Sequence, residues 1–231
     1  MARLEPHSHK QQTRNIGLFL ALVVLVQFGY PITVHGRGWL LLYQSFYALM
    51  FVSGGFIARE RPWQLWLNAA SAATFFVFNL WYVAAPENDA ANIAAYFALI
   101  PFHLLIIYSL FRFTEIQTRV NAATFMAAVA IYLLLGALFV PLYGALEIFF
   151  PGSFIDTSPE SAELVWQQLI YYSYVTLNTI GYGDILPVTL VAKSLSTLEG
   201  TLGVLYIAFV IARLVNLYDR DDGTESKRDR A

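Results

Sequence analysis

The chain has 231 residues, of which 58% are hydrophobic and only 13% are charged. Soluble domains carry about 25% charged residues, so this composition excludes an ordinary water-facing globule and indicates a protein whose solvent is lipid. The absence of cysteine excludes disulfides, thiol catalysis and Cys-based metal centres. A net charge of −2 does not favour nucleic-acid binding, and no nucleic-acid partner is expected.

Uncharged runs divide the chain into candidate membrane spans. A helix needs about 20 apolar residues to cross the hydrocarbon core of a bilayer, and five runs meet this length. They cover residues 15–36, 38–58, 62–86, 90–111 and 120–146. A sixth uncharged run, 164–183, is rich in polar residues and ends in Gly-Tyr-Gly. A seventh run, 185–212, is interrupted only by Lys193 and Glu199.

The distribution of Lys and Arg decides whether the run 164–183 crosses the membrane. If it enters and returns to the same face, 12 basic residues lie on the cytoplasmic side and two, Arg37 and Lys193, lie outside. If it crosses, five of the 12 move outside. The positive-inside bias therefore predicts six spans, a re-entrant loop and two cytoplasmic termini. Because non-helical backbone at membrane depth is tolerated where it is buried in protein or lines a watery cavity, the loop implies a pore or a binding site.

Residues 176–184 read Thr-Leu-Asn-Thr-Ile-Gly-Tyr-Gly-Asp and carry the candidate chemistry. A potassium ion gives up its hydration shell only where oxygen atoms replace it, and consecutive backbone carbonyls directed at one axis can do so. Such a backbone needs positive φ angles, which Gly181 and Gly183 adopt without a Cβ clash. Thr179 adds a hydroxyl at the inner end, and Asp184 places a carboxylate at the mouth.

This segment resembles the pore signature of potassium channels, with Ile180 where the usual filter has Val. The resemblance covers about residues 120–218. It implies that potassium is bound mainly by backbone carbonyls of Thr179, Ile180, Gly181, Tyr182 and Gly183. It also implies filter support from Tyr172, Asn178 and Asp184, with Asn178 standing where the family usually has Thr or Ser. One filter strand cannot surround an ion and four can, so we expect a homotetramer.

The run 185–212 carries the candidate gate. Gly203 stands nineteen residues after Asp184, where the family's inner helix often has a hinge glycine, and close packing is an equal alternative. Helical spacing places further apolar side chains beyond it at Val204, Ile207, Ile211 and Val215. A four-fold ring of such side chains would line the cavity and gate it by dewetting.

Two ionisable residues lie within the candidate spans. Because a carboxylate is costly in the membrane, we expect Glu199 to face the back of the pore helix in a structural hydrogen bond rather than to bind ions. For His103, a neutral, hydrogen-bonded histidine is favoured over a proton sensor. The fourth run, 90–111, contains no Arg or Lys, so voltage gating through this helix is not expected.

The sequence thus predicts an all-α integral membrane protein with six transmembrane helices, and with a re-entrant pore helix and filter loop between the fifth and sixth. The expected segments are a cytoplasmic N-terminal segment at 1–14, a four-helix region at 15–118, a pore domain at 119–218 and a cytoplasmic tail at 219–231. Within the pore domain we expect an outer helix at 120–149, a turret at 150–158, a pore helix at 159–177, a filter at 178–184 and an inner helix at 187–218.

The predicted function is passive, selective conduction of potassium across the plasma membrane, which in a prokaryotic cell is the inner membrane. Potassium is the permeant ion and the lipid bilayer the surroundings; no cofactor and no enzymatic activity are expected. One alternative is a secondary transporter, which is disfavoured because no inverted repeat with a second broken helix is evident. Another is a non-conducting channel-like subunit, which the intact Thr179, Gly181 and Gly183 disfavour.

Overall fold

The computed structural model describes the chain except for residues 1–8, 60, 86–87, 118–120, 158–163 and 229–231, and the side chains of His9, Arg37 and residues 214–228 also lie outside the description. Its elements are helices with two short strands. In chain order they are α1 (His9–Phe28), the 3-10 helix η1 (Tyr30–His35), α2 (Arg37–Ile57), α3 (Pro62–Ala84), α4 (Asp89–Ile116), α5 (Ala122–Phe149), β1 (Phe154–Asp156), α6 (Trp166–Leu177), β2 (Ile185–Pro187) and α7 (Leu190–Arg228). The predicted all-α class holds for the bulk of the fold, whereas the two strands were not predicted.

Five helices in the described part of the chain are long and apolar enough to cross a membrane. The candidate spans are Gly38–Ile57, Pro62–Ala84, Asp89–Ile116, Ala122–Phe149 and Leu190–Arg213. At 1.5 Å per residue, the 28 residues of α4 extend about 42 Å, more than the hydrocarbon core requires. Asparagine side chains begin both of the 28-residue helices, because Asn88 accepts from the Ala91 amide and Asn121 from the Thr124 amide.

The first predicted span, residues 15–36, is not a single helix. Helix α1 ends at Phe28, and the chain continues through Gly29 into η1. Pro31 lies at the start of η1 and has no amide hydrogen to donate to a continuing α-helix. The uncharged part of α1, residues 15–28, is therefore about 21 Å long, too short to cross a bilayer without η1.

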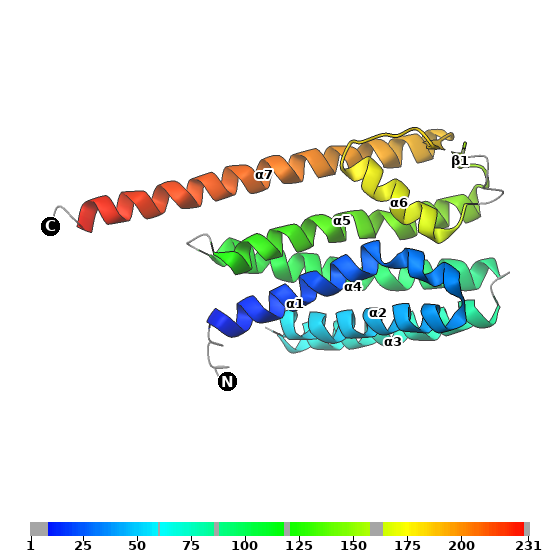
Figure 1. The fold of residues 1–231 in the computed structure, drawn as a ribbon, viewed down its shortest axis with the longest axis horizontal. Helices are drawn as coiled ribbons and strands as arrows, with labels where there is room; N and C mark the ends of the chain where they lie inside the picture. The colour runs from blue at the N-terminus through cyan, green and yellow to red at the C-terminus, as the bar shows by residue number, and fades with distance from the viewer. Residues whose placement is uncertain (1–8, 60, 86–87, 118–120, 158–163, 229–231) are drawn as a thin grey trace.

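Helices α1 to α5 run lengthwise beside one another, and the first half of α7 lies along α5 (Figure 1). The short helix α6 packs against both α5 and α7 near the end of the bundle that carries the strands. The start of α1 and the end of α7 lie at the opposite end (Figure 1). One hydrophobic core joins α1, α2, α4 and α5 through fully buried side chains such as Phe19, Met50, Phe102 and Leu134.

The pore-domain boundaries differ from those predicted at several positions. Helix α6 ends at Leu177 as expected, but it begins at Trp166 rather than at residue 159, because Val165 is extended and its amide donates to the Gln168 side chain. The predicted cap at residues 158–160 lies outside the described residues. In the predicted turret, β1 pairs antiparallel with β2, which follows the filter. Helix α7 begins at Leu190 rather than at the predicted residue 187, because Pro187 belongs to β2, and it continues to Arg228, beyond the predicted end at 218 and into the predicted tail.

Candidate functional site

The segment after α6 has an alternating backbone. Thr179, Gly181 and Gly183 have φ angles of +54°, +62° and +80°, while Ile180 and Tyr182 between them do not have positive φ. The two glycines fulfil the prediction, because the left-handed region carries no Cβ penalty for them. The positive φ of Thr179 was not predicted, since a β-branched residue rarely adopts it and the conformation costs about 1–3 kcal/mol. Alternation of this kind directs successive carbonyls to the same side of the strand.

The two ends of this segment are fixed by backbone hydrogen bonds. At the inner end, the Ile180 amide donates to the Val175 carbonyl at 2.9 Å, and at the outer end the Thr157 amide donates to the Asp184 carbonyl at 2.7 Å. Among the hydrogen bonds of the described residues, none uses a carbonyl oxygen of residues 179–183. The side chains of Ile180 and Tyr182 are about half and two-thirds exposed in the single chain. The segment therefore presents unpaired carbonyl oxygens on an open strand.

Aromatic residues of α6 hold the outer half of the segment. The Tyr171 hydroxyl donates to the Asp184 carboxylate at 2.6 Å, and its ring stacks on Tyr182 with a centroid distance of 6.3 Å. Asp184 is thus tied to α6 as well as to Thr157, the residue after β1. The predicted support residue Tyr172 is buried, and its hydroxyl is 2.6 Å from the Ser196 hydroxyl on α7. Tyr171 was not among the predicted site residues, because it lies outside the motif and 13 positions before Asp184.

Asn178 ends α6. Its side-chain amide donates to the Tyr174 carbonyl at 2.8 Å, and its side-chain oxygen accepts from the Tyr132 hydroxyl of α5 at 3.0 Å. The Tyr132 hydroxyl also lies 3.3 Å from the Leu177 carbonyl. Asn178 therefore adds a second donor to a terminal carbonyl of α6 and fastens this helix to α5.

Glu199 lies behind α6, fully buried and facing away from the open strand. The Tyr143 hydroxyl of α5 donates to its Oε2. Its Oε1 is 2.5 Å from the Ser173 hydroxyl of α6, and that hydroxyl is also 2.8 Å from the Gly136 carbonyl of α5. The expected structural hydrogen bond to the pore helix is present, and it joins three helices.

The contacts of Ser173 indicate where the proton of this group lies. A serine hydroxyl has one proton, and the Gly136 carbonyl can only accept. If Ser173 donates to Gly136, the contact with Glu199 is a hydrogen bond only when the carboxyl carries a proton and donates it. A neutral carboxyl therefore gives every one of these contacts a donor and an acceptor, and it avoids an unpaired charge within the membrane.

Residues 128–220 match a protein family described as Ion channel. The match indicates an ion channel pore in this part of the chain. The matched residues begin within α5, include α6 and the filter segment, and end within α7. Together with the five apolar helices, the match points to a multi-pass membrane protein. Comparisons with curated proteins and with solved structures found no match.

The predicted gate residues of the channel lie on α7, whose helix is unbroken at Gly203. A Cβ added at Gly203 would stand 2.2 Å from the Leu177 carbonyl oxygen, so this glycine lets α7 approach the end of α6. Close packing at Gly203 is therefore present, and a hinge role is untested. Past this contact the predicted lining side chains Val204, Ile207 and Ile211 are exposed in the single chain, whereas the side chain of Val215 lies outside the described residues.

Proposed function

We propose that the channel conducts potassium selectively, and that four copies of the chain surround the conduction path. The observation that carries this proposal is the alternating strand at residues 179–183, with its unpaired carbonyl oxygens. Oxygens in such a row replace the hydration shell of a monovalent cation in stages. Binding at several successive sites lets each ion enter favourably and leave again.

The proposal of a tetramer is supported by the side chains that are exposed on a single chain. A single strand offers carbonyls from one side, so an ion needs further strands around it. The filter side chains Ile180 and Tyr182 and the α7 side chains Val204, Ile207 and Ile211 are exposed on the single chain. Four-fold assembly about an axis beside the filter strand would cover them. In this arrangement the C-terminal end of α6, with its partial negative charge, points toward the path below the filter and favours a cation there.

In the proposed topology the filter end faces outward and both termini lie in the cytoplasm. The segment from α6 to β2 then enters the membrane and returns to the outer face, while α1 with η1 provides the sixth crossing. The bias of Lys and Arg toward the cytoplasmic side supports this orientation.

We further propose that α4 is not a voltage sensor. Between Ala90 and Phe111 it carries no Arg or Lys, and moving charge through the field is what makes gating steep. Its buried residues Phe102, Ile106 and Leu110 belong to the common core with α5, so sliding α4 would disrupt that packing. A shallow steady-state conductance–voltage curve is expected. A steep curve carrying several gating charges per subunit would contradict this part of the proposal.

Purified protein in liposomes tests conduction and selectivity. Reversal potentials measured in mixed potassium and sodium should follow the potassium gradient, and native mass measurement in mild detergent should give four copies. A wild-type protein that does not prefer potassium would overturn the filter assignment. Flux that saturates and requires a coupled ion would identify a transporter, and the absence of flux under all conditions would identify a non-conducting subunit.

A further inference from the structure

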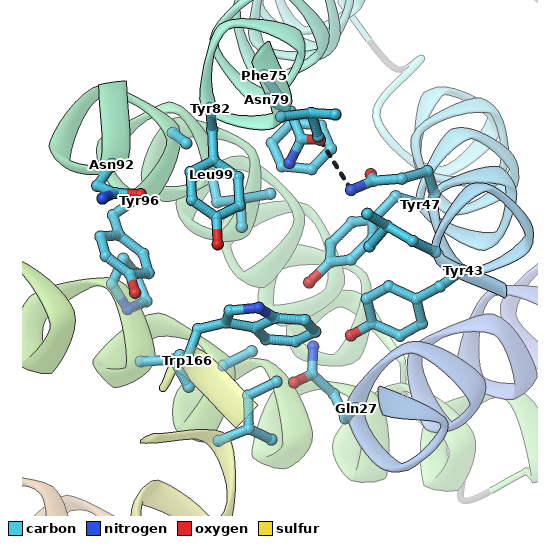
Figure 2. A pocket seen from close by; sticks show the side chains of 18 of the residues that line it. Gln27, Tyr43, Tyr47, Phe75, Asn79, Tyr82, Asn92, Tyr96, Leu99 and Trp166 are labelled. Carbon is cyan, nitrogen blue, oxygen red and sulfur yellow. Dashed lines mark hydrogen bonds between the residues drawn. The ribbon is translucent and has the colours of Figure 1, made fainter. Parts of the chain in front are cut away.

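A cavity of about 100 Å³ lies inside the helical bundle, apart from the filter segment. All six helices from α1 to α6 contribute to its walls, including Gln27 of α1, Tyr43 of α2, Tyr82 of α3, Tyr96 of α4 and Trp166 of α6. Figure 2 shows these side chains arranged around an open space, with the rings of Tyr43, Tyr47 and Tyr82 directed toward the indole of Trp166. On α1 to α5, the lining residues come from the half of each helix nearest the end of the bundle that carries β1 and β2.

The walls of the cavity are aromatic and uncharged. Six of the lining side chains are rings of Tyr, Phe or Trp, and none of the lining residues is Asp, Glu, Lys or Arg. An ionised guest would lose its hydration without gaining an opposite charge, and that loss is large in a membrane interior. Aromatic faces instead favour another ring, because offset and edge-to-face contacts between rings add to the gain from burial. The guest indicated by the walls is therefore uncharged and aromatic.

Two buried acceptor atoms of the lining residues lack a hydrogen-bond partner. His103 is almost fully buried, and its Nδ1 stands 2.8 Å from the Leu99 carbonyl. Because a carbonyl can only accept, Nδ1 carries the proton, and Nε2 of the neutral ring is then an acceptor with no donor. Gln44 donates from Nε2 to Asn79, and this leaves its Oε1 without a donor as well. Unpaired buried acceptors are costly, so a guest with an O–H or N–H group would be stabilised there once a small movement of either side chain opens its acceptor to the cavity.

The size of the space limits the guest to one small ring. An engineered apolar cavity of about 150 Å³ holds benzene, and a water molecule needs at least about 10–15 Å³. The cavity is smaller than the benzene-binding one, so it has room for several waters, and a ring of about the size of phenol fits when the lining side chains move slightly outward. Waters could supply donors to His103 and Gln44, but they would leave the surrounding ring faces in contact with water. An aromatic ring that carries one donor would pack against the ring faces and also donate to one of the two acceptors.

We propose that this cavity binds a small uncharged aromatic molecule bearing a hydroxyl or N–H donor, and that the donor is received by His103 Nε2 or Gln44 Oε1. Trp166 and Ile170 connect the site to α6, whose other end leads into the filter segment. A guest therefore touches the four N-terminal helices and the pore segment at once. Binding itself does not depend on potassium conduction.

The test uses fluorine NMR on the full-length protein in nanodiscs, with empty nanodiscs to measure partition into lipid. The probe is 4-fluorophenol, and 4-fluorotoluene and 4-fluorobenzylammonium serve as a probe of similar shape without a donor and as a cationic probe. We expect saturable binding of 4-fluorophenol that unlabelled phenol displaces. The loss of one hydrogen bond predicts about fivefold weaker binding of 4-fluorotoluene. Equal binding of phenol and toluene probes, tighter binding of the cation, or only lipid partition would overturn the proposal.

Substitutions locate the site. Ala95 lines the cavity, and Ala95→Phe should fill it and abolish saturable binding, whereas Ala73→Phe at an exposed position of α3 should leave binding unchanged. Of His103→Leu and Gln44→Leu, the variant that removes the acceptor in use should weaken 4-fluorophenol by about fivefold and leave 4-fluorotoluene unaffected; no weakening in either variant would overturn the assignment of the donor. Gel filtration and circular dichroism report folding of each variant. If folded Ala95→Phe still binds the phenol probe saturably, the guest sits elsewhere and the proposal is wrong.

Discussion

The contacts directly behind the filter and the four helices before the pore segment differ in how their buried polar groups are paired. Behind the filter, Tyr143, Ser173 and Glu199 form a closed set of contacts in which every group has a partner. In the described part of the chain, five buried side-chain polar atoms have no partner: three belong to Gln44, Asn68 and His103 of α2, α3 and α4, and the other two belong to Gln167 of α6 and Arg213 of α7, away from this set. Fully paired polar groups specify one arrangement, whereas unpaired groups beside a cavity leave room for a guest or a second packing. The comparison indicates a rigid pore support and an adaptable four-helix region.

Two helical glycines, one from each region, differ in what surrounds them. On α2, a Cβ at Gly54 would stand 2.8 Å from a ring carbon of the buried Phe102, which is a side-chain atom rather than backbone. On α7, a Cβ at Gly203 would stand 2.2 Å from a backbone oxygen of α6. The backbone at the end of a packed helix cannot move aside locally. An alanine substitution should therefore destabilise the protein more at Gly203 than at Gly54.

The largest effect is expected from Gly181→Ala. Alanine has the space it needs, because nothing lies within 4 Å of an added Cβ, but at φ +62° its backbone is strained. We expect potassium flux from liposomes to be lost while the protein still inserts and assembles. Gly152→Ala is the matched control, since Gly152 has φ +80° and equally open surroundings in the turn before β1. Equal loss of flux in both variants would mean that strain anywhere in the outer region, and not the filter, determines conduction.

Gly203→Ala should produce the next largest effect. Alanine stabilises a helix by about 0.5–1 kcal/mol relative to glycine, but a clash with the Leu177 carbonyl costs about 1–3 kcal/mol or more. We expect a lower midpoint of thermal unfolding in detergent and weaker tetramer recovery. Gly54→Ala, which meets a buried ring rather than backbone, should lower the midpoint less. A destabilisation by Gly54→Ala as large as that by Gly203→Ala would remove the distinction between the two regions.

The polar set around Glu199 predicts a contrast between two substitutions. Glutamine can accept from Tyr143 and donate to Ser173, so Glu199→Gln should unfold within about 1 kcal/mol of the wild type. Leucine leaves the Tyr143 hydroxyl without its acceptor, and Glu199→Leu should cost about 1–3 kcal/mol. Unfolding midpoints measured at equal protein and detergent concentration compare the two. If glutamine destabilises as strongly as leucine, the carboxyl is ionised and needs its charge.

Local patterns in the sequence predicted the filter glycines and most of the spans, because these depend on residues close together in the chain. Gly181 and Gly183 are recognisable from the motif, but Thr179 is not, since its positive φ is imposed by its place between α6 and Gly181. The end of α1 at Phe28 was missed because composition does not register where Pro31 interrupts an apolar run.

Contacts between residues far apart in the chain could not be predicted from the sequence. Tyr143 and Glu199 are 56 positions apart, and helical register indicated only which face of α7 the carboxyl occupies. The strands β1 and β2 are three residues each, too short to show an alternating pattern, and they pair across α6 and the filter. The aromatic cavity combines six helices, so no single segment carries its signature.

The smallest effect is expected where the two regions meet away from the filter. Arg213 of α7 forms a 3.0 Å ion pair with Glu115 of α4 and also donates to the Thr114 carbonyl. Both charged side chains remain partly exposed, and such pairs contribute about 0–1 kcal/mol. In a double-mutant cycle of Arg213→Gln and Glu115→Gln, the coupling in unfolding free energy should therefore stay below about 1 kcal/mol and fall as salt rises. A weak ion pair lets the inner half of α7 shift against α4 without unfolding either helix. A coupling of several kcal/mol that salt does not change would instead make the two regions one rigid unit at this end.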